Sequence, residues 1–148
     1  MATALIVYAS LTGNTEEIAD ILAESLEEQG VEVDIKECTS ATADEFHDYD
    51  ICVVATYTYG TDGDLPDEIV DFYEELEEED LTGKIYGALG SGDTFYDKFC
   101  QSVLDFDEQF AKTGATKGAE NVLVDLNAEE EDVKNIEAFA KRLVEKLG

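Results

Sequence analysis

Short apolar runs rich in Val and Ile alternate along this chain with segments whose apolar residues recur at helical spacing. Four runs are almost continuously apolar, with Asp125 as the one charged residue, as in strands buried on both faces of a parallel sheet, and they span residues 4–8, 51–55, 85–89 and 122–126. Residues 31–35 instead alternate apolar and acidic side chains, so we expect this strand at a sheet edge. Because each crossover between parallel strands must cover a face, the sequence predicts an α/β fold with a doubly wound five-stranded parallel sheet.

Four segments carry the helical pattern, each with one stripe that can cover the sheet. The stripe positions are Ile18, Ile21, Leu22, Ser25 and Leu26; Ile69, Phe72, Tyr73 and Leu76; Phe99, Val103, Phe106 and Phe110; and Val133, Ile136, Ala140, Leu143, Val144 and Leu147. Asn127, followed three residues later by Glu130, predicts a capping box at the start of the last helix. The acidic run at residues 74–80 is interpreted as a solvated helix end.

The charge of the chain limits its partners. Its 148 residues include 37 acidic and 9 basic residues, for a formal net charge of −28. A surface this negative repels nucleic acid and anionic lipid and favours cationic partners. The length predicts a single domain over residues 1–148. The first residues have no basic segment followed by an apolar stretch, and no run is long enough to span a membrane, so we expect a cytoplasmic protein.

Cysteine and histidine usage argues against metal or nucleophile chemistry. Cys38, Cys52 and Cys100 lie far apart without a CxxC pair, and we interpret them as reduced thiols. His47 is the only histidine, so neither a zinc site nor a Ser-His-Asp triad is expected. The sequence predicts no metal site and no catalytic residue.

The position of the edge strand predicts where a ligand binds. With residues 31–35 at the edge, the strand order becomes 2-1-3-4-5, and the order reverses between the first and third strands. Ligands of open α/β sheets bind beyond the carboxyl ends of the strands at such a reversal. The candidate site therefore comprises three loops, at residues 9–15, 56–65 and 90–97.

The first loop has the composition of a phosphate site. It reads Ser10-Leu11-Thr12-Gly13-Asn14-Thr15 and joins a buried strand to the start of a helix. Unpaired N–H groups at a helix N-terminus, together with hydroxyl donors, favour an anion. The loop has no lysine or arginine, so neutral donors would hold the phosphate. Neither GxxxxGK[ST] nor GxGxxG is present, which argues against a nucleotide hydrolase or a dinucleotide site, while simple helix capping is the alternative.

The second and third loops combine glycine with aromatic residues. They read Thr56-Tyr57-Thr58-Tyr59-Gly60-Thr61-Asp62-Gly63-Asp64 and Gly90-Ser91-Gly92-Asp93-Thr94-Phe95-Tyr96-Asp97. A flat aromatic ligand could stack on the tyrosine rings while backbone groups bind its polar edge. Ordinary packing at the rim of the domain is the alternative for any one of these rings.

These three loops together resemble the FMN-binding loops of bacterial flavodoxins, and the resemblance covers nearly the whole chain. Because residues 122–126 lead directly into the last helix, the sequence is similar to the short-chain branch of that family. The resemblance implies a flavodoxin-like fold and a role for each loop. It assigns the FMN phosphate to Ser10, Leu11, Thr12, Gly13, Asn14 and Thr15, the ribityl and phosphate side to Thr56, Tyr57 and Thr58, the two ring faces to Tyr59 and Tyr96, and the pyrimidine edge to Ser91, Gly92 and Asp93.

The resemblance also implies a low-potential electron carrier between a flavodoxin reductase and acceptor oxidoreductases with basic docking surfaces, active as a monomer. Glycine at position 60 would let the Gly60 carbonyl turn and accept a hydrogen bond from N5 of the flavin after one-electron reduction. Acidic residues near the flavin oppose a second electron, each by about 0.3 to 1.4 kcal/mol at about 12 Å. These residues are Asp62, Asp64, Asp67, Asp93 and Asp97. Tyr59 replaces a common tryptophan and Thr61 a frequent acidic residue, which bears on the redox potentials.

Two other functional classes of similar fold require residues that this sequence lacks, and two alternatives remain. A response-regulator receiver needs paired acidic residues after the first strand and an aspartate after the third, but Ser10 and Tyr57 are found there. A low-molecular-weight phosphatase needs cysteine and arginine in the first loop, which has neither. A small FMN-dependent reductase remains an alternative, although little of the chain is left for a substrate pocket. A flavodoxin-like activator dedicated to one enzyme is a further alternative.

Overall fold

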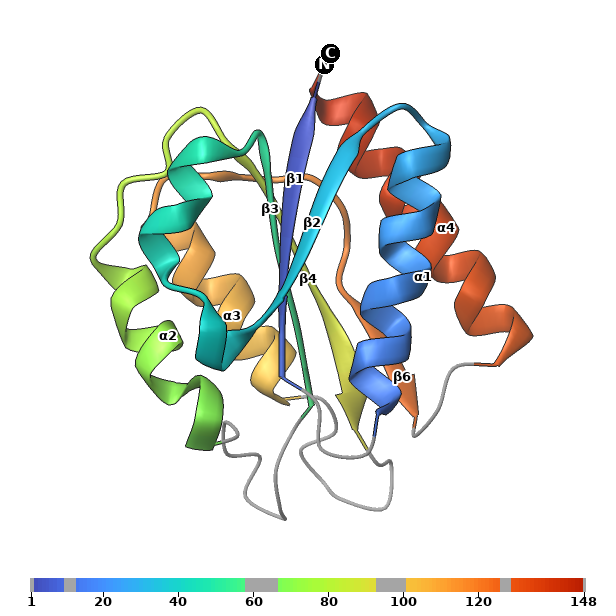
Figure 1. Ribbon diagram of the computed structural model, residues 1–148, viewed down its shortest axis with the longest axis horizontal. Helices are drawn as coiled ribbons and strands as arrows, with labels where there is room; N and C mark the ends of the chain where they lie inside the picture. Colours follow the sequence, from blue (N-terminus) through green and yellow to red (C-terminus); the bar gives the residue numbers. More distant parts are fainter. Residues whose placement is uncertain (1, 10–12, 58–66, 93–100, 126–128, 148) are drawn as a thin grey trace.

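A parallel β-sheet lies between two layers of helices in the computed structural model, which describes residues 2–9, 13–57, 67–92, 101–125 and 129–147 (Figure 1). Helices α1 and α4 cover one face, and α2 and α3 cover the other (Figure 1). The strands are β1 (Thr3–Tyr8), β2 (Glu32–Glu37), β3 (Ile51–Tyr57), β4 (Ile85–Gly92), β5 (Thr116–Lys117) and β6 (Val122–Asp125). The helices are α1 (Asn14–Glu28), α2 (Asp67–Glu77), α3 (Gln101–Lys112) and α4 (Glu130–Lys146), with the short 3₁₀ helices η1 (Cys38–Ser40) and η2 (Ala43–Asp48).

The strand order confirms the predicted fold class. The order is β2-β1-β3-β4-β5, with β6 also paired to β4, and every pairing is parallel. Strand β2 lies at the edge and has no fully buried residue, as its alternating sequence predicts. The chain reverses direction across the sheet between β1 and β3, which is where the predicted binding crevice belongs.

The fifth strand position differs from the prediction because two separate segments occupy it. Strand β5 pairs with the start of β4, where Thr116 lies opposite Ile85, and β6 pairs with its end, where Val122 lies opposite Leu89. Residues 118–121 therefore lie opposite residues 87–88, and the excess chain interrupts the ladder.

Asp107 of α3 links β4 to β5 and to the segment just before β6. Its carboxylate accepts hydrogen bonds from the Tyr86 hydroxyl (2.6 Å), Lys117 Nζ (2.8 Å) and Asn121 Nδ2 (3.0 Å). Burial raises the pKa of the Asp107 carboxyl, but the hydrogen bonds from Lys117, Tyr86 and Asn121 outweigh that effect and leave the pKa below its usual value. The carboxylate is thus held in its charged form.

The continuously apolar strands contribute to two cores, one on each face of the sheet. In β1, Ala4 and Ile6 pack toward α1 and α4, whereas Leu5 and Val7 pack toward α2 and α3. All four side chains are fully buried. This two-sided burial explains why the strand sequence has no polar alternation.

The start of α4 corrects a prediction. The helix begins at Glu130, and its N-cap is Glu129 rather than Asn127. The backbone N–H of Glu129 donates to Asp132 Oδ2 (3.0 Å) in a capping box that begins two residues later than expected. Three acidic residues in the first turn suit the positive end of the helix dipole, which explains why this start is favoured. Asn127 and Phe99 lie outside the described residues.

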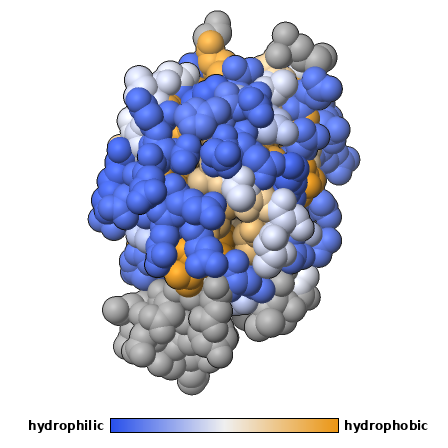
Figure 2. All heavy atoms as spheres, turned by 60° about the vertical axis from the view of Figure 1, so that its left-hand side comes forward, coloured by the Kyte–Doolittle hydropathy of each residue, from blue (hydrophilic) through white to orange (hydrophobic). Residues whose placement is uncertain are grey.

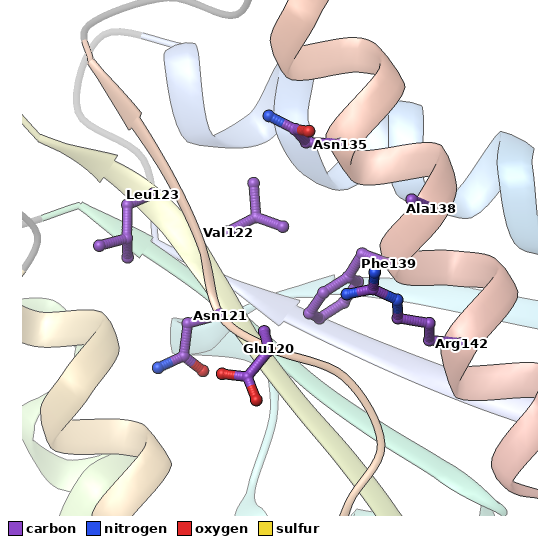
Figure 3. A pocket seen from close by; sticks show the side chains of 8 residues that line it. All are labelled: Glu120, Asn121, Val122, Leu123, Asn135, Ala138, Phe139 and Arg142. Carbon is purple, nitrogen blue, oxygen red and sulfur yellow. The ribbon is translucent and has the colours of Figure 1, made fainter.

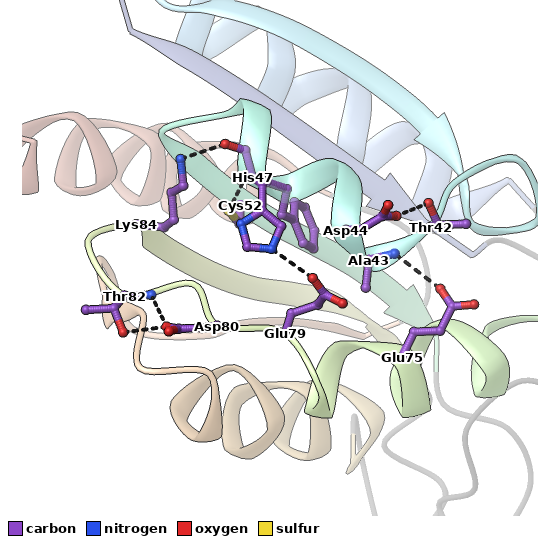
Figure 4. Close-up of polar contacts among 11 residues, drawn as sticks. Thr42, Ala43, Asp44, His47, Cys52, Glu75, Glu79, Asp80, Thr82 and Lys84 are labelled. Atoms are coloured by element: carbon purple, nitrogen blue, oxygen red, sulfur yellow. Dashed lines mark hydrogen bonds and ion pairs between the residues drawn. The ribbon is translucent and has the colours of Figure 1, made fainter.

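The acidic run at residues 74–80 covers the end of α2 and the residues after it, and two of its carboxylates bind η2 (Figure 4). Glu75 Oε1 accepts a hydrogen bond from the N–H of Ala43 (3.2 Å). Glu79 Oε1 lies 2.8 Å from Nε2 of His47, whose backbone carbonyl accepts a hydrogen bond from Lys84 Nζ (3.0 Å). The side chain of His47 is 47% exposed, so the histidine is a surface group that pairs with a carboxylate.

Cys38 and Cys52 are buried free thiols, as predicted. Burial raises the pKa of each thiol to about 12, so both are protonated at neutral pH. Cys100 lies outside the described residues. Among the described helices, none combines the length and apolarity needed to cross a bilayer.

Candidate functional site at the carboxyl edge of the sheet

The carboxyl ends of β1, β3 and β4 lie side by side and bring parts of the three predicted loops together. Tyr8 lies opposite Ala55, and Tyr57 opposite Ser91, in the sheet register. The N–H of Ala9 donates to the carbonyl of Ala55 (2.9 Å), so the β1–β3 contact continues past the end of β1. Described residues of the predicted site at this edge are Gly13, Asn14, Thr15, Thr56, Tyr57, Ser91 and Gly92.

Gly13 sets the start of α1. It is the N-cap residue with φ of 90°, a left-handed conformation that glycine adopts without the steric cost of a side chain. The carbonyl of Gly13 accepts the first helical hydrogen bond from the N–H of Glu17 (3.0 Å). The N–H groups of Asn14, Thr15 and Glu16 have no acceptor within the helix, as in the first turn of any helix, and such groups can bind an anion.

Two buried hydroxyls from distant parts of the sequence meet beside this helix start. Thr15 Oγ1 lies 2.8 Å from Ser91 Oγ, and the two residues are 1% and 4% exposed. Thr56 is also fully buried, but its hydroxyl donates to the carbonyl of Tyr57 (3.1 Å). The structure therefore brings Thr15 and Ser91 together, while the Thr56 hydroxyl is engaged with its own strand.

The third loop begins where β3 and β4 approach very closely. A Cβ atom added to Gly90 would lie 1.8 Å from the carbonyl oxygen of Thr56 and 2.8 Å from Cγ2 of Val103. No side chain fits there. The glycine thus fixes the separation of the two strands just before Tyr57 and Ser91.

The sequence patterns did not identify Glu68 as a neighbour of the site. Its carboxylate Oε1 accepts a hydrogen bond from the Tyr57 hydroxyl (2.9 Å), which links the end of β3 to the first turn of α2. The residues lie eleven positions apart, with the second loop between them, so no local periodicity relates them. The order of the elements could have indicated this contact, because the helix that follows a strand in this fold packs beside it and its first turn lies near the end of that strand.

The remaining predicted site residues lie outside the described part of the chain. They are Ser10, Leu11, Thr12, Thr58, Tyr59, Gly60, Asp93 and Tyr96. Their roles stay predictions, as does the turn of the Gly60 carbonyl.

The described groups fit a phosphate monoester. The donors are backbone N–H groups at the start of α1 and buried neutral hydroxyls, a set that binds an oxyanion through oriented dipoles. The first turn of α1 carries Glu16 and Glu17, which are exposed. Because these carboxylates do not neutralise an anion, close fit to the neutral donors must supply the binding.

A cavity of about 210 Å³ lies away from this edge of the sheet, between β6 and α4 (Figure 3). It is bordered by the start of β6 and the middle of α4, including Val122, Phe139 and Arg142. It contains none of the predicted site residues, so we do not assign the ligand to it.

The fold is that of a doubly wound α/β protein, and its candidate phosphate site lies where the strand order reverses. Comparison with known proteins narrows this class, because the family model for flavodoxin matches residues 6–147. Probable flavodoxin 1 of Bacillus subtilis is 42% identical over 142 residues, which cover 95% of this chain and 89% of the relative.

Two solved structures agree with this match. A flavodoxin of Streptococcus pneumoniae TIGR4 is 60% identical with a TM-score of 0.96, covering 98% of this chain and 99% of that one. A short-chain flavodoxin associated with a non-canonical PDU bacterial microcompartment is 46% identical with a TM-score of 0.98 and full coverage of both chains. The chain belongs to the flavodoxin family. It is an FMN-binding electron-transfer protein rather than an enzyme, which confirms the predicted class, cofactor and function.

Proposed function

We propose that this protein holds FMN at the carboxyl edge of its sheet with neutral donors and carries single electrons at low potential between a reductase and acceptor oxidoreductases. The start of α1, where Gly13 is followed by the buried Thr15–Ser91 hydroxyl pair, is the observation that carries the proposal. A small FMN-dependent reductase and an activator dedicated to one enzyme are the competing assignments.

Each loop has a separate task in this proposal. FMN, when bound, supplies a ring system that accepts and releases one electron at a time. Residues 10–15 hold its phosphate, residues 56–58 lie along its ribityl chain, and residues 91–93 bind the polar edge of the ring. Tyr59 and Tyr96 cover the ring faces and exclude water, and the Gly60 carbonyl would accept a hydrogen bond from the flavin N5–H group.

The charge of the chain accounts for the low potential. Since no lysine or arginine occurs in the phosphate loop, the negative charge of the phosphate is not neutralised locally. The net charge of −28 adds a negative field around the site. Both effects oppose the negative charge that a second electron would place on the ring and would make the fully reduced protein a strong electron donor.

The same charge favours basic partner proteins. The face that includes α2 is mostly hydrophilic (Figure 2), and its exposed acidic residues include Asp71, Glu74, Glu75 and Glu78. We propose a cytoplasmic monomer with one domain over residues 1–148 that docks to cationic surfaces. Nucleic acid and membranes are not its partners.

A stepwise anaerobic reduction, followed by visible absorption, tests the carrier function. We expect two separated one-electron steps, with the singly reduced protein accumulating as a long-lived species that absorbs at long wavelength. Bleaching in a single two-electron step would favour the reductase instead. Failure of the protein to take up FMN would contradict the proposal.

The dependence of electron transfer on salt tests the docking proposal. We expect the second-order rate to a basic cytochrome to fall by about tenfold or more between low and high ionic strength, because salt screens the attraction between charged surfaces. Electron transfer to a small neutral quinone is the control and should change little. A rate to the cytochrome that does not respond to salt would show that the acidic surface does not steer docking.

A further inference from the structure

We propose that Ser91 is a positioning residue that aims the Thr15 hydroxyl at the FMN phosphate, an inference that rests on the proposed phosphate site. The two hydroxyls come from the first turn of α1 and the end of β4, and 76 positions separate them in the sequence. Their 2.8 Å contact is the direct side-chain link between the phosphate loop and the strand that leads into the ring-binding loop.

The number of hydroxyl protons shows that the Thr15–Ser91 pair needs one further hydrogen-bond acceptor. Two hydroxyls carry two protons, and their mutual hydrogen bond uses one of them. Among the described residues, each of the two hydroxyls has the other as its hydrogen-bond partner. The second proton therefore points to an acceptor outside the described protein groups, because leaving it unpaired in so buried a place would be costly.

The positions of the two residues decide the direction of the donation. Thr15 belongs to the first turn of α1, where the helix favours an anion, whereas Ser91 lies on the strand behind it. Ser91 therefore donates to Thr15 Oγ1, and Thr15 donates its own proton to a phosphate oxygen. Such a bond to a charged acceptor is stronger than one between neutral groups.

In this arrangement the side chain and the main chain of Ser91 have different roles. The main chain near residue 91 is assigned to the flavin ring, but the hydroxyl acts on the phosphate through Thr15. Removing the hydroxyl should therefore weaken binding of FMN and leave binding of riboflavin, which lacks the phosphate, unchanged.

The test is a comparison of FMN and riboflavin dissociation constants for the full chain after the flavin has been removed. We expect Ser91→Ala to weaken FMN by about tenfold and riboflavin by less than about twofold, the tenfold change corresponding to about 1.4 kcal/mol. Ser25→Ala is the control, because Ser25 is a buried serine on α1, the helix that carries Thr15. That variant should leave both constants unchanged.

A double-mutant cycle checks that Ser91 acts through Thr15. In a Thr15→Ala background, Ser91→Ala should cause no further loss of FMN affinity. Additive losses, equal losses for FMN and riboflavin, or an unchanged FMN constant in Ser91→Ala would each overturn the role of Ser91. If Ser91→Ala does not fold, Ser91→Cys keeps nearly the same volume with a weaker donor, and the same FMN-selective loss is expected.

The outcome for the unaltered protein separates this inference from the proposed phosphate site. If the unaltered protein bound riboflavin as tightly as FMN, the phosphate site itself would be wrong, and the role of Ser91 with it. A strong preference for FMN that persists in Ser91→Ala would overturn the role of Ser91 alone.

Discussion

Gly90→Ala is expected to destabilise the protein by about 3 kcal/mol or more and to abolish FMN binding. The added Cβ would lie 1.8 Å from the Thr56 carbonyl oxygen, which is backbone and cannot rotate away. Because Gly90 pairs with Thr56 in the sheet, relief of the clash requires β3 and β4 to separate. That separation would also displace Tyr57 and Ser91. Urea unfolding followed by circular dichroism, together with FMN titration, measures both effects.

Gly30→Ala is the control for the loss of a glycine. Gly30 has φ of 87°, but nothing lies within 4 Å of an added Cβ, so only backbone strain opposes the change. We expect a cost of about 1 to 2 kcal/mol and an unchanged affinity for FMN. If the Gly90→Ala variant were as stable as the Gly30→Ala variant, the close approach of β3 and β4 at Gly90 would be contradicted.

Asp107→Asn is expected to lower the free energy of unfolding by about 2 kcal/mol at neutral pH. The asparagine side chain keeps one acceptor oxygen for the three donors that now share a carboxylate, namely Tyr86, Lys117 and Asn121. The Lys117 ammonium also loses its nearer ion-pair partner. The side chains of Asp107 and Lys117 are 22% and 33% exposed, so water replaces part of the lost interaction. Urea unfolding at pH 7 measures the loss.

The effect of Asp107 should depend on pH. Because the folded state lowers the pKa of this carboxyl, its contribution to stability is present above the unfolded pKa, about 3.9. The contribution is lost as the pH falls through the lower pKa of the folded state. The difference in stability between the unaltered protein and Asp107→Asn should therefore be constant above about pH 5 and shrink below about pH 4.

Glu108→Gln serves as the charge control. It removes one negative charge from the position directly after Asp107, where the side chain is exposed. We expect a small change in stability, within about 0.5 kcal/mol, since surface substitutions of this kind have little effect. If both variants showed the same loss and the same pH profile, net charge rather than the Asp107 contacts would explain the result.

The predictions made from the sequence succeeded where a local pattern has a direct physical cause. Continuous apolar runs such as residues 51–55 require burial on both faces, and the alternating strand requires an edge, so the sheet order follows from them. The reversal of strand order then predicted the edge of the sheet at which a ligand would bind. Gly13, Thr15 and Ser91 were all found at the carboxyl edge.

Other features depend on contacts that no local pattern contains. The divided fifth strand is accompanied by contacts of Asp107 with Lys117, in β5, and with Asn121, just before β6. The start of α4 was misplaced because Asn127 and Glu129 both precede suitable acidic residues, and the chain can satisfy either capping pattern.

The sequence by itself determined the fold class, the strand order and the family, because burial and helix periodicity act over a few neighbouring residues. The edge of the sheet at which the ligand binds stays a prediction from that strand order. The tertiary structure alone decided that Ser91 contacts Thr15, that Glu68 contacts Tyr57 and that Gly90 has no room for a side chain. Those contacts join residues distant in the sequence, and their geometry follows from the register of the strands and the packing of the helices against them.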